Sequence, residues 1–183
     1  VSSFKVTGEV YYHDLHDKDG NGISIEKGDC PVKYAMVKID GEPVIKNGNV
    51  IMTDSDGQFE IEVPIGEHRI SIEKQGHTFS TGYYPSVDGV ENFQEDKSGL
   101  LFVDNTTMQV KGRVVGGLLE AEKELGMDLS TNNIGKATFR FVSQNNMDLL
   151  EVITNHTTGE YASELLPIKY VIYDFSVDSN PPI

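Results

Sequence analysis

Residues 50–71 read VIMTDSDGQFEIEVPIGEHRIS, and this stretch decides the fold. Between residues 59 and 63, apolar and polar side chains alternate strictly, which is typical of a strand with one buried face. Residues 54–57 (DSDG) predict a turn before it, because Asp side chains cap backbone amides and Gly accepts positive φ. Residues 64–66 predict a second turn, and a second alternating strand follows at residues 68–73. The stretch therefore predicts a β-hairpin of a sandwich and carries no evident chemistry.

The second half of the sequence repeats the first half at matched positions. The separation of 22 residues between Ala35 and Gly57 recurs between Ala137 and Gly159. Several short matches in one order are hard to obtain by chance, so the chain is expected to hold two copies of one fold. The matched residues are Gly8 with Gly112, Val10 with Val114, Ala35 with Ala137, Gly57 with Gly159, and Pro64 with Pro167.

The motifs of the first half follow a recognisable order. Gly8-x-Val10 comes first, Thr53-Asp54-x-Asp56-Gly57-x-Phe59 follows, and Pro64-x-Gly66-x-His68-x-Ile70 comes last. This order resembles the carboxypeptidase regulatory-like domain, a transthyretin-type sandwich that is related to the Cna-B-type repeats of bacterial adhesins. The resemblance covers residues 4–80 well and residues 106–175 more loosely.

The resemblance also carries expectations for single residues. In that family an aromatic residue, usually Tyr, occupies the position of His68, so His68 is expected to be a half-buried core residue. Tyr170 keeps the usual type in the second half. Related domains form a Lys–Asn isopeptide bond within a Glu-x-x-Ala-Pro-x-Gly-Tyr context. The sequence lacks this context, so no such crosslink is expected.

The repeat and the resemblance together predict an all-β chain of two tandem transthyretin-like sandwiches of the Ig-like, Greek-key type. The first is expected at residues 1–82, and the second, more divergent one at residues 106–183. Residues 83–105 are expected to form a long acidic connection, although Leu100 to Val103 could make a short strand. At most one short helix is expected, at residues 118–125, where a glycine ends it.

Composition excludes several classes of partner. The formal net charge is −14, whereas nucleic acids and anionic membranes require a basic face, so neither is expected to bind. No apolar run approaches the roughly 20 residues that span a bilayer, so direct membrane insertion is not expected. Cys30 is the only cysteine, which excludes an intrachain disulfide. Because the chain begins at Val1 without a signal peptide, we expect a fragment of a longer secreted or surface-anchored bacterial protein.

Residues 13–26 form a polar segment rich in the oxygen ligands that calcium prefers. Asp17-x-Asp19-x-Asn21 places these ligands at alternate positions, as at the start of a calcium loop. An EF-hand requires a bidentate acid at the twelfth position, where Gly28 stands, so that loop type is excluded. A looser site like that of adhesin B-type repeats stays open, and so does an acidic turn that caps its own backbone. The calcium candidates are Asp14, Asp17, Asp19, Asn21 and Glu26.

The sequence shows no catalytic signature. It has no Ser-His-Asp or Cys-His arrangement, P-loop or dinucleotide fingerprint, and His13 and His16 share one loop without a distant third ligand. We therefore expect a non-catalytic spacer or adhesion module, with calcium as its one candidate cofactor. Its expected partners are the neighbouring domains of the parent protein and, as a further candidate, a host or cell-surface protein.

Two alternative functions stay open at this point. The chain could be an accessory domain of an extracellular hydrolase, or a carbohydrate-binding module. In the second case Tyr83 and Tyr84 would form an exposed aromatic platform on which a sugar stacks. The same tyrosines could instead pack beneath their own loop, because exposed aromatic patches are uncommon on monomers.

Overall fold

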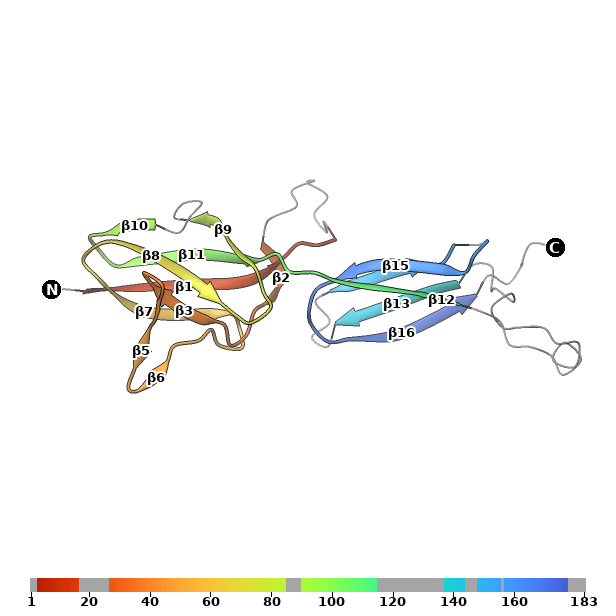
Figure 1. Cartoon of the computed structure of the whole chain (residues 1–183), viewed down its shortest axis with the longest axis horizontal. Helices are drawn as coiled ribbons and strands as arrows, with labels where there is room; N and C mark the ends of the chain where they lie inside the picture. The colour runs from red at the N-terminus through yellow and green to blue at the C-terminus, as the bar shows by residue number, and fades with distance from the viewer. Residues whose placement is uncertain are drawn as a thin grey trace, which may run out of the picture. The chain divides into compact units, whose positions relative to one another are not determined.

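The structure is a computed structural model, and it describes residues 3–16, 27–84, 90–114, 137–143, 148–155 and 157–177. Within these ranges every regular element is a β-strand, which confirms the predicted all-β fold of tandem sandwiches. The chain divides into two compact units, Val1–Thr106 and Thr107–Ile183 (Figure 1).

The larger sheet of unit 1 is built around β1 (Ser3–His13). Along one edge, β1 pairs in parallel with β11 (Lys97–Asp104). Along the other edge it pairs antiparallel with β7 (Gln58–Pro64) and with β2 (Lys27–Pro31). β9 (Phe79–Tyr84) lies beyond β11 and completes this sheet. Both edges of β1 are therefore hydrogen-bonded along most of its length.

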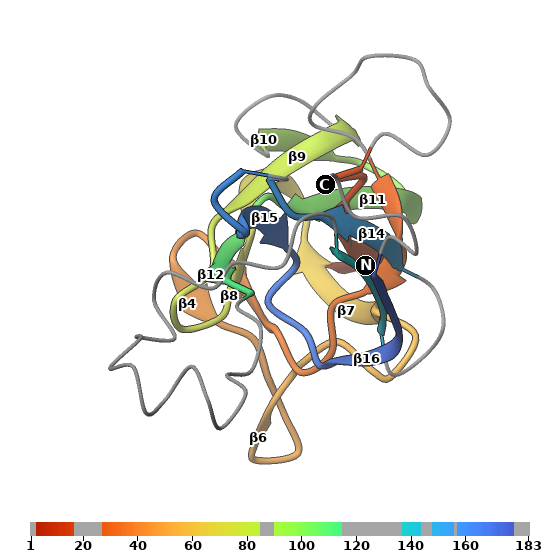
Figure 2. The same ribbon diagram turned by 90° about the vertical axis from the view of Figure 1, so that its right-hand side faces the viewer.

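The smaller sheet of unit 1 has β8 at its centre. Its strands follow the order β10 (Val90–Phe93), β8 (Gly66–Glu73), β3 (Met36–Ile39) and β4 (Glu42–Pro43). A separate hairpin of β5 (Ile45–Lys46) and β6 (Asn49–Val50) projects from the body of unit 1 in both views (Figures 1 and 2).

The core of unit 1 lies between the two sheets. The alternation that predicted β7 is present in the structure, with Phe59, Ile61 and Val63 buried and the residues between them exposed. The smaller sheet contributes Val37 and Ile70, which are at most 1% exposed. The predicted hairpin is wrong, because β7 pairs with β1 in the larger sheet and β8 pairs with β10 and β3 in the smaller sheet. The chain crosses from one sheet to the other between β7 and β8, and the alternating face of β7 is the face that the second sheet covers.

The expectation that residues 83–105 form a connection is wrong for most of that range. The range contains β10 and β11, and β11 is an inner strand of the larger sheet. Leu100 to Val103 are all buried, and they form a continuous apolar run without alternation. Strands with parallel pairing and two covered faces have this continuous pattern, so a search for alternation overlooks them. The predicted helix at 118–125 lies outside the described residues.

Unit 2 consists of two small sheets. β12 (Met108–Arg113) pairs antiparallel with β15 (Glu160–Leu165). The other sheet has the order β14 (Leu149–Ile153), β13 (Ala137–Ser143) and β16 (Tyr170–Val177). Phe139 of β13 contacts Phe175 of β16 and Tyr161 of β15, with ring centroids 5.0 and 5.2 Å apart. This aromatic group joins the two sheets of unit 2.

The matched residues of the sequence make the same backbone contacts in both units. The Ala35 amide donates to Thr53 Oγ1 at 3.0 Å, and the Thr53 amide donates to the Ala35 carbonyl at 2.8 Å. In unit 2 the Ala137 amide donates to Thr154 Oγ1, and the Thr154 amide to the Ala137 carbonyl, both at 2.9 Å. In each unit one threonine therefore fixes the start of the strand that begins near the matched alanine.

The matched glycines also take the same conformation. The Val10 amide donates to the Gly57 carbonyl at 2.7 Å, and the Val114 amide to the Gly159 carbonyl at 2.8 Å. Gly57 and Gly159 both have φ of +73°, a left-handed conformation that glycine adopts without strain. The two turns therefore close onto the first strand of each unit in the same way.

We expect Thr53→Val to lower the free energy of unfolding of unit 1 by about 1–3 kcal/mol. The Thr53 side chain is 1% exposed, and its hydroxyl accepts from the Ala35 amide and donates to the Val32 carbonyl at 2.7 Å. Valine keeps the shape of the side chain but leaves the Ala35 amide and the Val32 carbonyl without the hydroxyl that pairs with them. Urea unfolding followed by circular dichroism measures the effect. Thr53→Ser keeps the hydroxyl and is the control, and equal stability of the two variants would contradict the prediction.

Candidate functional site

The candidate calcium segment joins β1 to β2 at one end of unit 1. Of the five predicted ligands only Asp14 is described, whereas Asp17, Asp19, Asn21 and Glu26 lie outside the described residues. Calcium binding therefore stays a prediction. The described residues show how the two ends of the segment are held.

Close backbone packing brings the two ends of this segment together. His13 is opposite Lys27 in the antiparallel ladder, and the register shifts between Tyr11 and His13. At Gly28 a Cβ atom would lie 2.8 Å from the His13 carbonyl oxygen, so a larger residue would push the strands apart. The ends of the predicted calcium segment are therefore fixed by β-pairing, whether or not a metal binds.

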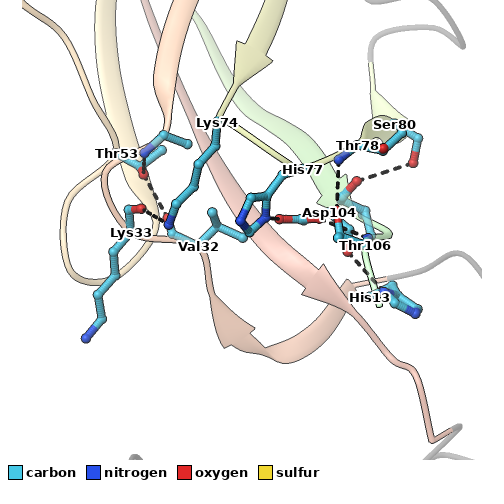
Figure 3. A network of polar contacts seen from close by, with 12 residues as sticks. His13, Val32, Lys33, Thr53, Lys74, His77, Thr78, Ser80, Asp104 and Thr106 are labelled. Atoms are coloured by element: carbon cyan, nitrogen blue, oxygen red, sulfur yellow. Dashed lines mark hydrogen bonds and ion pairs between the residues drawn. The ribbon is translucent and has the colours of Figure 1, made fainter. Parts of the chain in front are cut away.

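A buried carboxylate lies directly beneath these ends. Asp104 is the last residue of β11, and the parallel ladder places it beside Tyr12 of β1. Its side chain is fully buried, and Oδ2 lies 2.5 Å from His77 Nδ1 (Figure 3). Its Oδ1 accepts from the Thr106 amide at 3.0 Å. A charged group in the core requires such partners, because desolvation otherwise opposes its ionisation.

His13 completes this polar network from the other side of Asp104. Figure 3 shows the rings of His13 and His77 approaching Asp104 from different directions. His13 Nδ1 lies 3.0 Å from the Asp104 carbonyl oxygen, and a carbonyl only accepts, so this nitrogen carries the proton. We name His13, His77, Asp104 and Thr106 the Asp104 network.

Two backbone contacts tie the Asp104 network to the turn before β9. The Thr78 amide donates to Thr106 Oγ1 at 2.8 Å, and the Asn105 amide donates to the Thr78 carbonyl at 3.0 Å. The exit of the chain from unit 1 is therefore bonded both to β1 and to the turn at residues 77–78.

Tyr12 lies beside the Asp104 network and stays protonated. Burial raises the pKa of the Tyr12 phenol well above its ordinary value, and the negative charge of Asp104 raises it further. The Tyr12 ring is 3% exposed and lies 6.1 Å from the His77 ring, centroid to centroid. A neutral phenol of this kind packs in the core and is not a base.

The geometry of the Asp104 network fits structural support. Asp104 is fully buried and His77 is 12% exposed, so the carboxylate does not face an open cleft. In the part of the chain that the structure describes, no three His, Cys, Asp or Glu side chains converge as metal ligands. Asp104 and His77 are 27 residues apart and were not among the residues predicted from the sequence. An Asp directly after the apolar run Leu100–Val103 is the one signal that points to a buried charge.

The tyrosines of the predicted carbohydrate platform lie at the end of β9. Tyr84 is opposite Leu101 of β11 in the ladder. The side chains of Tyr83 and Tyr84 lie outside what the structure describes. Carbohydrate binding there stays a prediction.

His68 lies at a second polar site, on the smaller sheet. Its side chain is 19% exposed, and its Nδ1 lies 2.6 Å from Asp40 Oδ2. The other carboxylate oxygen accepts from the Arg69 amide at 2.9 Å, and Asp40 itself has φ of +51°. These hydrogen bonds, first from His68 and then from Arg69, lower the pKa of Asp40. His68 is half-buried as expected, and its ring is held by a carboxylate on the turn after β3.

Comparisons with known proteins show limited likeness. No family model matches the chain, and no curated protein matches its sequence. Its structure is similar to the Bacillus anthracis TIE protein, with 14% identity and a TM-score of 0.44, covering 98% of this chain and 29% of that one. A streptococcal ancillary pilin has 14% identity and a TM-score of 0.34, with 97% and 53% covered. A DUF3823 family protein from Parabacteroides merdae has 12% identity and a TM-score of 0.33, with 90% and 81% covered.

The chain thus spans less than two thirds of the first two of these proteins. At such identities and TM-scores the likenesses carry no argument about family or activity. Among the described residues, no helix has the length and apolar character needed to cross a membrane.

We expect Asp40→Asn to lower the melting temperature by a few degrees at pH 7 and by less at pH 3. The lowered pKa means that the fold favours the carboxylate over the acid. This stabilisation is present above the ordinary pKa of 3.8 and is lost as the pH falls through the lowered value. Asparagine tolerates the left-handed φ, so the backbone is not strained. Thermal melts of both proteins at the two pH values measure the effect.

Glu67→Gln is the matched control for this variant. Glu67 lines the same groove beside Asp40 and His68, and its carboxylate makes none of the hydrogen bonds described above. Glu67→Gln removes one negative charge but leaves the contacts of Asp40 with His68 and with the Arg69 amide unchanged. An Asp40→Asn deficit that is equal at pH 3 and pH 7 would contradict the role of the ionised carboxylate.

Proposed function

We propose that this chain is a non-catalytic, load-bearing spacer of a larger secreted or cell-surface protein. The observation that carries the proposal is the pairing of the first and last strands of unit 1. β1 and β11 are parallel neighbours, in continuous register from Gly8 opposite Leu100 to Tyr12 opposite Asp104, and the register shifts once between Val6 and Gly8. The chain enters unit 1 at the start of β1 and leaves it at the end of β11. These two points lie at opposite ends of the same ladder.

This geometry determines how unit 1 responds to tension along the chain. Pulling on the start of β1 and the end of β11 slides the two strands past each other in opposite directions. All hydrogen bonds between them then carry the load together, whereas an antiparallel pair pulled at one end opens bond by bond. Forced unfolding depends on the barrier to unfolding, and simultaneous rupture makes that barrier high.

The Asp104 network supports the same function. It lies where β11 ends, and it bonds the exit of the chain to β1 through His13 and to the turn before β9 through His77. His13, His77 and Asp104 therefore hold the end of the β1–β11 ladder to which the load is applied. This use accounts for a buried charge in a place where the described residues of unit 1 form no catalytic geometry.

The cellular location rests on other grounds. The resemblance of residues 4–80 to carboxypeptidase regulatory-like and Cna-B-type domains favours an extracellular or cell-surface protein. The formal net charge of −14 keeps such a module apart from anionic surfaces and in solution. The partners that fit a spacer are the neighbouring domains of the parent protein.

Single-molecule pulling tests the proposal. Cysteine handles at Ser3 and at the exposed Thr107 load β1 against β11, and handles at Ser3 and Pro64 load β1 against β7. Ser3 and Pro64 are opposite each other at one end of an antiparallel ladder, so this second geometry opens bond by bond. We expect a rupture force several-fold higher for the first pair. Equal forces in the two geometries would overturn a load-bearing role.

Calcium stiffening of the segment between β1 and β2 is part of the proposal. Binding to the folded state alone would raise stability by about 2.7 kcal/mol at a metal concentration 100 times the dissociation constant. We expect the melting temperature in millimolar calcium to exceed that in EDTA by several degrees. Asp17→Ala and Asp19→Ala should remove the difference. Asp56→Ala, in the turn before β7, is the control that should keep it, and superimposable melts would make the segment an ordinary acidic turn.

A further inference from the structure

β7 has one hydrogen-bonded edge and one open edge. It pairs with β1 along one side, and in the part of unit 1 that the structure describes no strand pairs with its other side. The chain is described without a gap from residue 27 to residue 84, so the segments before and after β7 are both included. The segment before it bridges to β3, and β8 after it pairs with β10 and β3. We call the unpaired side of β7 the open edge.

The known hydrogen bonds show which backbone groups of β7 face the open edge. The Val10 amide donates to the Gly57 carbonyl, and these two residues continue the register in which β1 pairs with β7. Gly57 therefore faces β1. Successive residues of a strand point to opposite edges, so the amides of Glu60 and Glu62 point away from β1. They lie at the open edge.

Two neighbouring residues agree with this assignment. Asp54 fills the first outward position, because its Oδ1 accepts from the Gln58 amide and its own amide donates to the Gln58 carbonyl, both at 2.9 Å. Pro64, which has no amide to donate, stands at the last outward position, as prolines at a sheet edge do. Between them, the outward amides of Glu60 and Glu62 have no backbone partner among the described residues. Two hydrogen-bond donors are therefore available to a further strand.

A groove of about 670 Å³ adjoins the open edge. The β5–β6 hairpin, which projects from unit 1 (Figures 1 and 2), forms one wall of this groove at its base. An extended chain paired with the open edge would therefore lie between β7 and the segment that follows the hairpin. The residues that these two elements contribute to the groove are Gln58, Phe59 and Glu60 of β7, and Lys46, Ile51 and Met52 of the hairpin and the segment after it.

Apolar side chains beside the groove are uncovered. Met52 lines it and is 50% exposed. Ile45 and Val50, which pair in the hairpin, are 64% and 38% exposed, and Ile65 directly after β7 is 51% exposed. Apart from Tyr34, these are the exposed large apolar side chains among the described residues of unit 1. Exposed apolar groups that gather beside an unpaired strand edge mark a place where another chain binds.

The charge of β7 argues against pairing of two copies of this chain at the open edge. In the registers that pair most of two antiparallel β7 strands, glutamate stands opposite glutamate, either Glu60 opposite Glu62 or one of them opposite its own copy. Like charges directly opposite each other destabilise a ladder. The formal net charge of −14 adds repulsion between whole chains. The occupant therefore differs from β7 in charge.

A basic strand complements the open edge. β1 shows this pairing at the closed edge, where Lys5 Nζ lies 3.2 Å from Glu60 Oε1 while the Glu60 side chain is still 56% exposed. Among the described residues, the groove is lined by three acids, Glu9, Asp54 and Glu60, and one base, Lys46. Opposite charges across a ladder stabilise it, so bases at alternate positions of a docked strand fit this edge.

This chain does not supply such a strand. Only one pair of bases stands at alternate positions in its sequence, Lys111 and Arg113. Both belong to β12, whose backbone is already paired with β15. The charges therefore favour another polypeptide over a second copy, or another segment, of this chain.

We propose that the open edge of β7 docks an extended segment of another polypeptide, with Lys or Arg at alternate positions and apolar residues between them. The docked segment runs antiparallel to β7 and accepts hydrogen bonds from the Glu60 and Glu62 amides. Its bases lie beside the carboxylates of the same two residues, and its apolar residues point into the groove toward Met52. Backbone bonds give affinity, and the alternation gives specificity. This docking is independent of the load-bearing role, because it uses the edge of β7 that β1 leaves free.

A synthetic hexapeptide in which Lys and Val alternate is the probe. We expect it to bind the full chain in a fluorescence anisotropy titration, with an affinity that falls as the salt concentration rises. In amide exchange followed by NMR it should slow the Glu60 and Glu62 amides. The Ile61 and Val63 amides, which face β1, should change little. A peptide of the same composition with its Lys residues in one block, and a peptide in which Glu and Val alternate, should not protect these amides.

Glu62→Pro removes an amide at the open edge and leaves the amides that face β1. We expect it to weaken binding of the alternating peptide by about tenfold or more. Continued protection of the Ile61 and Val63 amides shows that β7 is still paired with β1. Glu62→Gln is the matched control. It removes the same charge but keeps the amide, so binding should persist with a smaller dependence on salt.

Four outcomes would overturn the proposal. The first is no binding, or binding without protection, by the alternating peptide. The second is equal protection by the block peptide, which means that charge alone attracts it. The third is protection of Glu60 and Glu62 in the chain alone at every concentration, which means that the chain covers its own edge. The fourth is protection that rises with protein concentration, which identifies the occupant as a second copy of this chain.

Discussion

Unit 1 depends on hydrogen bonding along both edges of β1. Antiparallel pairing with β7 uses one edge, and parallel pairing with β11 uses the other. The parallel pair joins segments 91 residues apart at His13 and Asp104, so its formation requires the closure of a long loop. The buried apolar side chains of β11 offset this cost. Without β11, Gly8 would lose the cover of Leu100, and Asp104 would have no position in the core.

The parts of the fold that follow from local pattern were predictable. Asp54 Oδ1 accepts from the amides of Asp56 and Gln58, both at 2.9 Å, and Gly57 has positive φ, as the DSDG turn requires. β7 and β8 follow from alternation, but their predicted pairing as a hairpin is wrong, because alternation marks a strand and does not determine which strand it pairs with. β11 could not be recognised by alternation, because a strand covered on both faces has a continuous apolar run. The Asp104 network was also missed, since its contacts span 27 and 91 residues and leave no periodic signal.

The recurrence of contacts between the units shows which features act locally. The Thr53–Ala35 and Thr154–Ala137 contacts each involve residues within one unit, and so do the turns at Gly57 and Gly159. The packing of an aromatic ring on a glycine, Phe59 on Gly8 and Tyr161 on Gly112, is also local to each unit. A Cβ atom at residue 112 would collide with Tyr161 whether or not another strand lies beside β12. The glycine of β12 therefore requires only its ladder partner.

The same comparison assigns different mechanical behaviour to the two units. In unit 1 a load on the chain passes through the hydrogen bonds between β1 and β11. In unit 2 the first strand, β12, and the last described strand, β16, belong to different sheets. A load there passes through side-chain packing, chiefly the contacts of Phe139 with Tyr161 and Phe175. Because packed side chains separate by smaller steps than a sheared ladder, the proposed role implies that unit 2 yields before unit 1.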